Sequence, residues 1–498
     1  MHNPWEFLTR LKFRKWFVLG LITLIATLLL SGSADLTPAA IAQPPVNPLA
    51  QVQIDPETVV GQPGFFRVGQ STRDRWWLID PEGQPFFFKG VTSIGTGRDV
   101  PPADNYPGYI EPYPGYSEII TQKYGSDAAA FRDATYERLR RWNFNALGAW
   151  SAGDLTDQDF PYTVVLDFVR VGPTIESPWV KVPDVFALEW RQAIDAQAQK
   201  FVATRRNDPM LVGYFTDNEL GWGDLEKPDH LPRLNPDLLL TSDFKPSLLQ
   251  VCLSLKPEQP AYQAAWRFVL ARHGEHLVGL AKAWQVDIET PEQIQQWTQT
   301  GQALVSRGYL ADQRAFVTEF AQRYFEQTAA AIHRYDDHHL ILGCRFGSPP
   351  SAALFTALKR PWVDVVSANN YRYAMYERMD QYYQATHLPI LNGEFSWGHS
   401  VFAERPLPDE PEGGLPATER MVRNGEQALT RAWTHPALVG YTWYRWVDQP
   451  TGQPPYIPPI SLGLVTLADE PNHWHTDLLT QLNAQAEAIA AGIESELP

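Results

Sequence analysis

Cysteine is scarce in this chain. Only Cys252 and Cys344 occur among 498 residues, which is too few for a disulfide framework. We expect two buried free thiols, with a single bridge as the alternative. The sequence has no His-Glu-x-x-His motif, no calcium-loop spacing and no Gly-x-Ser-x-Gly elbow. We therefore expect no metal and no cofactor.

Positive charge is also in deficit. The chain carries 41 Lys and Arg against 57 Asp and Glu, a formal net charge of −16. This balance argues against nucleic acid or an anionic membrane surface as a partner, and weakly against a densely sulfated or uronic polymer. Aromatic residues, in contrast, are plentiful, with 18 tryptophans. Flat rings stack on sugar faces in clefts, although most of these rings are expected to fill the core.

The one long apolar run lies near the N-terminus. Basic residues between Arg10 and Lys15 precede about 15 apolar residues, which is short for a membrane span and typical of a signal peptide. We interpret residues 1–42 as a signal peptide, or alternatively as an uncleaved membrane anchor. Residues 43–60, rich in Pro, Ala and Gln, read as a linker. The body is expected to be secreted or periplasmic, or anchored with its catalytic part outside the cytoplasm.

Residues 61–490 show a repeated alternation of strand-like and helical patterns. Most of the strand-like runs are too apolar to alternate, as in parallel strands that are covered on both faces. Eight repeats predict an α/β fold, a closed (β/α)₈ TIM barrel, with a doubly wound open sheet as the alternative. The predicted strands are 86–94, 144–150, 163–168, 211–219, 340–346, 363–371, 389–395 and 438–446.

Other local patterns complete this picture. A short N-terminal β-hairpin is predicted around the turn Asp80-Pro81-Glu82-Gly83. Helices are predicted over 187–205, 309–334 and 418–434, and another after a Thr290 N-cap. Long insertions at 101–116, 176–186, 222–258, 403–416 and 449–459 all follow strands. In a barrel they would wall a cleft at the C-terminal face, where barrel active sites lie.

Two of the predicted strands end in a glutamate, at Glu219 and Glu394. An ionised carboxylate is costly to bury, so its place at the end of an apolar strand needs a reason. Glycosidic bond cleavage requires a pair of carboxylates, about 5–5.5 Å apart for retention and about 6.5–9.5 Å for inversion. We predict Glu219 as acid/base and Glu394 as nucleophile. The alternatives are a helix N-cap pair at Asn218-Glu219 and a salt-bridged strand-end Glu394.

Further candidates follow the ends of other strands. Arg345, Tyr371 and His399 are expected to stabilise the ionised nucleophile, and Trp443 or Trp446 to form a floor under the sugar. Strand alternation points Asp217 away from the site, so it is predicted to be structural. For each single residue, packing in the core is the alternative. The predicted substrate-binding residues are Asn218, Trp222, Arg345, Asn370, Tyr371, Trp397, Trp443 and Trp446, and the other polar or aromatic strand ends are Asn369 and Trp150.

Four segments carry a resemblance to a known clan. They are residues 77–83 (WLIDPEG), 141–148 (RWNFNALG), 206–219 (RNDPMLVGYFTDNE) and 392–396 (NGEFS). The chain resembles retaining (β/α)₈-barrel glycoside hydrolases that place Asn-Glu on the fourth strand and a nucleophilic Glu on the seventh. Within them it is most similar to β-agarase and β-galactosidase-like enzymes. The resemblance implies the same roles for Glu219 and Glu394 as the strand ends do.

The expected function is therefore a retaining β-glycosidase that hydrolyses galactan-like, agarose-type oligo- or polysaccharide by double displacement. No cofactor is needed, and the expected partner is the saccharide alone, with membrane attachment only through the N-terminal segment. Two alternatives remain: a transglycosidase that remodels cell-surface glycans, and a non-catalytic carbohydrate-binding barrel.

Overall fold

The structure, a computed structural model, describes residues 47–96, 115–156, 160–398, 400–411, 414–448 and 461–493. Eight parallel strands close into a barrel, which confirms the predicted (β/α)₈ fold, and each predicted strand overlaps one of them. In order around the barrel, the strands are β4 (Phe88–Val91), β5 (Ala146–Leu147), β6 (Tyr162–Val165), β9 (Leu211–Asn218), β13 (Leu340–Phe346), β14 (Val366–Asn369), β15 (Ile390–Phe395) and β16 (Leu438–Trp443).

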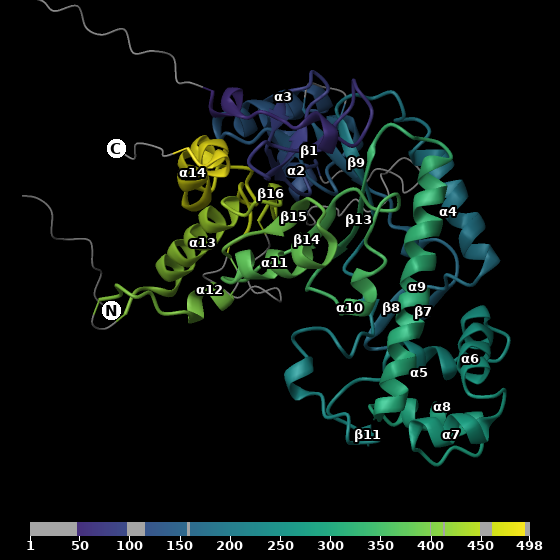
Figure 1. The fold of residues 1–498 in the computed structure, drawn as a ribbon. Coiled ribbons are helices and arrows are strands. Elements are labelled where there is room, and N and C mark those ends of the chain that lie inside the picture. The colour runs from purple at the N-terminus through teal and green to yellow at the C-terminus, as the bar shows by residue number, and fades with distance from the viewer. Residues whose placement is uncertain are drawn as a thin grey trace, which may run out of the picture. The chain divides into compact units, whose positions relative to one another are not determined.

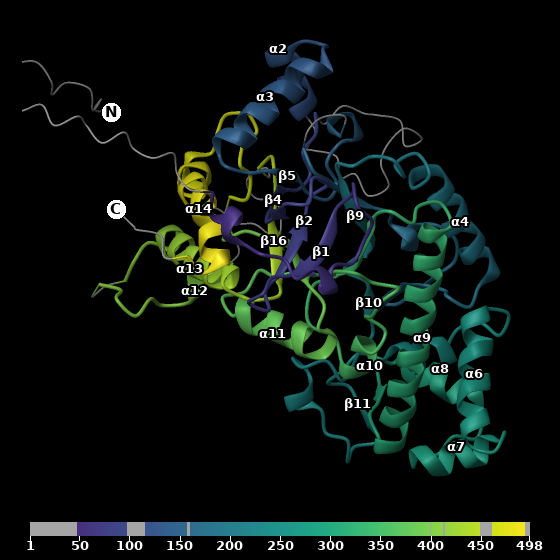
Figure 2. The ribbon, with the colours of Figure 1, turned by 45° about the horizontal axis from the view of Figure 1, so that its top comes forward.

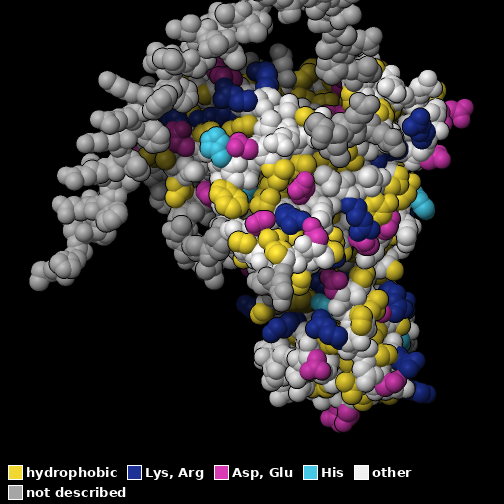
Figure 3. All heavy atoms as spheres, turned by 90° about the vertical axis from the view of Figure 1, so that its left-hand side faces the viewer, with side chains coloured by type: hydrophobic (Ala, Val, Ile, Leu, Met, Phe, Trp, Pro, Cys, Tyr) yellow, Lys and Arg dark blue, Asp and Glu magenta, His cyan; other side chains and the backbone are white. Residues whose placement is uncertain are grey.

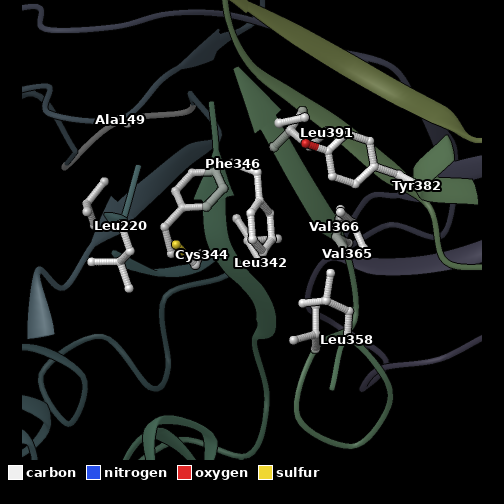
Figure 4. Packing of buried hydrophobic residues seen from close by; sticks show 14 of the residues in the cluster. Ala149, Leu220, Leu342, Cys344, Phe346, Leu358, Val365, Val366, Tyr382 and Leu391 are labelled. Carbon is white, nitrogen blue, oxygen red and sulfur yellow. The ribbon is translucent and has the colours of Figure 1, made fainter. Parts of the chain in front are cut away.

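The barrel strands are buried on both faces, as their near-continuous apolar runs require. Figure 4 shows Leu342, Cys344 and Phe346 of β13 packed near Val366, with the Tyr382 ring close to Leu391. The ring centroids of Phe346 and Tyr382 are 6.1 Å apart. Both cysteines are buried and free, as predicted.

Helices cover the outside of the barrel. The predicted helices over 187–205, 309–334 and 418–434 are confirmed with shifts of a few residues at their ends. They are amphipathic; Trp190 and Ile194, for example, face the core. The helices outside the large insertion are α2 (Tyr116–Tyr124), α3 (Ala128–Arg141), α4 (Leu188–Phe201), α9 (Arg307–His333), α10 (Ala352–Phe355), α11 (Met375–Thr386), α12 (Ser400–Glu404), α13 (Ala417–Trp433) and α14 (His473–Ala491).

The insertion after β9 is a helical subdomain, which the sequence pattern did not predict as such. Figure 1 shows its four helices gathered at one end of α9. Buried Asp312 of α9 accepts hydrogen bonds from Arg272 Nε at 2.8 Å and Trp284 Nε1 at 2.7 Å and so ties the insertion to the barrel helix. Thr290 and Gln293 form the expected capping box. Its elements are α5 (Leu248–Leu253), α6 (Pro260–Arg272), α7 (Leu277–Trp284), α8 (Pro291–Gln299), β11 (Leu240–Thr241) and β12 (Ala303–Leu304).

A small antiparallel sheet precedes the barrel. The predicted hairpin is present as β2 (Trp76–Ile79) and β3 (Pro85–Phe86), and β1 (Arg67–Gln70) adds a third strand. Figure 2 shows β1 and β2 near β16, where the Trp76 amide donates to the Pro436 carbonyl at 2.8 Å. The sheet thus packs against the segment that enters the last barrel strand.

The start of this compact unit corrects the predicted linker boundary. Residues 47–60 do not extend freely; Ile54 and Val60 form bridges to Ser71 and Val68, and both pack on the core. Two short 3₁₀ helices, η1 (Pro48–Gln51) and η2 (Pro56–Thr58), use the prolines as first helical residues rather than as spacers. The packed body therefore begins at Asn47.

Several predictions fall outside the described residues: the targeting segment 1–42, the linker up to residue 46, most of the insertions 101–116 and 449–459, and His399.

The segment after β6 forms the hairpin β7 (Thr174–Glu176) and β8 (Val180–Pro183), and β8 pairs with β10 (Gly221–Trp222). Among the described residues, no helix has the length and apolar character to span a bilayer. On the face in Figure 3, the described acidic and basic side chains are interspersed among apolar ones.

Candidate active site

The two predicted catalytic glutamates are held by the same barrel strand. Glu219 directly follows β9, and its amide donates to the Arg345 carbonyl of β13 at 2.9 Å. The guanidinium of that same Arg345 reaches Glu394 Oε1 of β15 at 3.1 Å. The carboxyl ends of parallel strands meet at one rim, and here β13 joins the two acidic strand ends there.

Their surroundings differ sharply. The Glu219 side chain is exposed, and its residue adopts a left-handed φ of 48°, which is uncommon away from glycine. Glu394 is 6% exposed, and its Oε2 accepts a hydrogen bond from the Tyr371 hydroxyl at 2.5 Å. The exposed carboxyl of Glu219 can reach a substrate oxygen. The buried carboxyl of Glu394 is fixed in place by its contacts with Tyr371 and Arg345.

The electrostatics connect the two groups. Burial raises the pKa of the Glu394 carboxyl to about 7; the Arg345 guanidinium opposes the rise, the negative charge of Glu219 adds to it, and the Tyr371 bond opposes it. A proton on Glu219 removes one of the causes that raise the pKa of Glu394, and so favours its ionised form.

Asn369 connects the two sides of the site. Its Nδ2 donates to Glu219 Oε1 and to Asn218 Oδ1, both at 3.0 Å. Since the Asn218 oxygen is occupied in this way, its amide nitrogen is the group left to donate to a substrate hydroxyl. Sequence reasoning named the Asn369-Asn370 pair but selected Asn370, which is fully buried and donates to Asn392 Oδ1 at 3.0 Å.

The predicted tryptophans lie deeper than expected. Trp397, Trp443 and Trp446 are fully buried. Their indole N–H groups donate within the protein, to His475 Nδ1, the Leu462 carbonyl and the Tyr116 hydroxyl, respectively. The structure therefore places these three rings in the core beneath the rim, which corresponds to the packing alternative.

Other rings lie beside the carboxylates. The Arg345 guanidinium carbon is 4.2 Å from the ring centroid of Trp150. Tyr444 meets Tyr371 edge to face, with ring centroids 6.3 Å apart. Both rings follow barrel strands, and Trp150 was among the strand-end candidates. Tyr444 sits inside the aromatic run 443–446, which sequence reasoning noticed without choosing this member.

Two cavities adjoin Glu219. One of about 310 Å³ is lined by Trp179, Trp222 and Phe346, and another of about 540 Å³ by Trp150 and Asn218. Glu219 lines both. Trp222 is 6% exposed and otherwise packs on aromatic rings of α9. The acidic side chain thus stands between two spaces of sugar size.

The predicted structural role of Asp217 is confirmed. Its carboxylate is fully buried, accepting hydrogen bonds from the Val169 amide at 2.7 Å and the Tyr324 hydroxyl at 2.5 Å. These bonds lead away from the rim toward the 3₁₀ helix η4 (Phe168–Arg170) and toward α9. Among the described residues, no three His, Cys, Asp or Glu side chains are grouped in a way that could hold a metal.

Comparisons with known proteins agree with this picture. The chain is 24% identical to β-agarase A of Vibrio sp. (strain JT0107), over 86% of this chain and 46% of that protein. It is 23% identical to β-agarase B of the same strain, over 82% and 47%. The chain spans about half the length of these curated relatives. These matches confirm the resemblance to β-agarases.

Solved structures show the same fold. An exo-β-agarase superposes with a TM-score of 0.66 at 20% identity, covering 87% of this chain and 67% of that one. Another agarase gives 0.63 at 21% identity, covering 86% and 66%. No protein-family model matches the chain.

Proposed function

We propose that this protein is a retaining β-glycosidase that hydrolyses agarose-type galactan, with Glu219 as acid/base and Glu394 as nucleophile. The observation that carries the proposal is that Arg345 contacts both glutamates, accepting from the backbone amide of exposed Glu219 and pairing with the carboxylate of buried Glu394. The names of the similar proteins, β-agarase A and B, support agarose as the substrate class. The proposal further assigns residues 61–490 to the catalytic body, with 47–60 packed on it, and residues 1–42 to export.

In the first half-reaction, exposed Glu219 acts as the acid and buried Glu394 acts as the nucleophile. Protonated Glu219 gives its proton to the glycosidic oxygen as the bond to the anomeric carbon breaks. Ionised Glu394 forms a bond from a carboxylate oxygen to that carbon, yielding a glycosyl ester. Arg345 and Tyr371 hold the attacking carboxylate in one orientation. A fixed nucleophile reduces the entropy that the attack must lose.

The second half-reaction reverses the roles. Glu219, now ionised, takes a proton from water while the water oxygen bonds to the anomeric carbon. The ester bond to Glu394 breaks, and its carboxylate returns to Arg345 and Tyr371. Since the ester is uncharged, Glu219 meets no repulsion from Glu394 while it acts as a base. Two inversions at one carbon give net retention.

The test uses Glu394→Ala on agaro-oligosaccharides with a chromogenic leaving group. We expect loss of turnover of at least about 10⁴-fold, since the covalent route is lost, in a protein that still folds at the assay temperature. Azide should restore part of the rate and yield an α-glycosyl azide, because it attacks from the face that Glu394 occupied.

The matched control is Glu319→Ala, which removes an exposed glutamate of α9 that pairs with Arg323. It should retain normal turnover. Full activity in Glu394→Ala would refute the assignment of the nucleophile. A wild-type protein that binds agaro-oligosaccharides without cleaving them would instead favour the binding barrel, and transfer to sugar acceptors would favour the transglycosidase.

A further inference from the structure

A third carboxylate, Asp167, lines the larger cavity beside Glu219. This cavity of about 540 Å³ is bounded by Trp150, Asn218 and Glu219 on the rim and by Lys181 of β8. Asp167 follows β6, so its side chain belongs to a third strand end of the same barrel. Neither strand alternation nor the paired-glutamate motif pointed to it.

The local backbone does not account for this aspartate. Asp167 occupies the N-cap position of η4 (Phe168–Arg170) with a left-handed φ of 50°, but its side chain makes no capping hydrogen bond. Asp217 instead accepts from the Val169 amide at 2.7 Å. An aspartate before a helical turn normally caps it. Here Asp217 supplies that bond, and the Asp167 carboxylate lies against the cavity.

The carboxylate is buried and poorly compensated. The Asp167 side chain is 7% exposed, and its one close ionic contact among the described residues is Arg170 Nε at 3.3 Å, on a side chain that is 69% exposed. That contact is to Oδ2, which is buried and accepts no hydrogen bond of good geometry from any described residue. Buried carboxylate oxygens normally have donors, because desolvation without them is costly. The Asp167 carboxylate therefore keeps hydrogen-bonding capacity beside the cavity that it lines.

The charges that line the cavity indicate which chemical class of ligand it can bind. Burial raises the pKa of Asp167, while the charges of Arg170, Arg345 and Lys181 lower it. Arg345 is committed to Glu394. The cavity wall itself then carries Asp167, Glu176 and Glu219 against Arg170 and Lys181. A neutral ligand rich in hydroxyl donors fits such a wall better than an anionic one.

We infer that Asp167 accepts hydrogen bonds from hydroxyl groups of a sugar unit bound in this cavity, and that it selects unsulfated over sulfated galactan. The inference rests on the proposed function and deepens it. A carboxylate accepts from two neighbouring hydroxyls at once. A sulfate ester at either position removes the donor and brings a second negative charge against Asp167.

The experiment compares wild type, Asp167→Asn and Asp167→Ala on neutral agaro-oligosaccharides. Loss of a hydrogen bond to a charged group should lower kcat/KM about tenfold to a hundredfold in Asp167→Ala. The effect should fall on KM more than on kcat, and Asp167→Asn should be intermediate because one acceptor oxygen remains. Asp337→Asn and Asp337→Ala, at an exposed aspartate paired with Arg206, serve as matched controls.

Binding is measured separately by calorimetry in the Glu394→Ala background, with a neutral and a sulfated galactan oligosaccharide of equal length. The neutral one should bind more tightly, and Asp167→Asn should narrow the difference. Equal or tighter binding of the sulfated one, or an unchanged KM and affinity in Asp167→Asn, would overturn the inference. If Asp167→Ala does not fold, the KM and affinity of the isosteric Asp167→Asn decide whether Asp167 binds the sugar.

The outcomes for this inference and for the proposed function are distinct. A wild type that cleaves neither oligosaccharide refutes the glycosidase assignment, and the binding arm still decides the role of Asp167. A wild type that cleaves agaro-oligosaccharides while the Asp167 variants match it refutes the role of Asp167 alone.

Discussion

Replacing Glu219 by Gln should make Glu394 a stronger acid. The negative charge of Glu219 is one of the causes that raise the pKa of Glu394 to about 7. Glutamine keeps the shape of the side chain and can still accept from Asn369, so the hydrogen-bonded frame persists while the charge is lost. The perturbation therefore isolates the electrostatic link between the two carboxyl groups.

The size of the effect follows from Coulomb's law. Two unit charges about 5.5 Å apart, as in a retaining pair, interact with about 3 kcal/mol at an effective dielectric constant of about 20, which equals about two pKa units. Glu219 is exposed, so solvent screens part of this interaction. We expect the pKa of Glu394 to fall by about one unit, to about 6.

The assay must bypass the missing acid. A 2,4-dinitrophenyl glycoside of an agaro-oligosaccharide has a leaving group that departs without protonation, so its kcat/KM against pH reports the ionisation of the nucleophile in the free enzyme. Only ionised Glu394 attacks. In the wild type the rate should therefore rise as pH increases through about 7, and in Glu219→Gln the rise should occur at lower pH.

The acidic limb is the part of the kcat/KM profile that rises with pH. The reasoning fails if the acidic limb of Glu219→Gln coincides with that of the wild type, or moves to higher pH. Either result would mean that the charge of Glu219 does not reach Glu394. Glu319→Gln, remote from the site on α9, should leave the limb where it is.

Two further variants probe the nucleophile and the core beneath it. Tyr371→Phe removes the hydroxyl bond that lowers the pKa of Glu394, so the acidic limb should move to higher pH and kcat/KM at pH 6 should fall about tenfold; an unmoved limb would exclude that bond as a determinant. Gly425→Ala would place a Cβ 2.2 Å from the Trp397 Cβ, and the clash should destabilise the fold by about 1–3 kcal/mol. Thermal unfolding measures this loss, and an unchanged midpoint would show that helix α13 can shift at this position.

Most of the barrel could be predicted from the sequence, because each of its strands is encoded by a short continuous run of apolar residues. Runs such as 211–219 and 390–395 are apolar enough to be recognised as buried strands, and the barrel strands overlap all eight predicted runs. The helical insertion was harder to predict. Its helices are short and are tied to the barrel by Asp312, whose partners Arg272 and Trp284 lie far away along the chain.

Strand irregularities explain why side-chain alternation alone does not identify Asn369 as a partner of Glu219. The register of β14 against β15 shifts between Ala368 and Asn369, and that of β13 against β9 shifts around Gly343. Side chains alternate between the two faces of a regular strand, and a register shift interrupts this alternation. Asn369 therefore contacts Glu219, whereas Asn370 donates to Asn392.

The sequence by itself determined that apolar parallel strands would deliver two glutamates to one rim, because side-chain patterning dictates the strands and chain direction dictates which ends meet. Only the tertiary structure decided that Arg345 contacts the Glu219 backbone and the Glu394 carboxylate, that Trp397, Trp443 and Trp446 fill the core, and that Asp167 lines a cavity. Those outcomes depend on register, bulges and contacts between distant segments, and no local pattern in the chain encodes them.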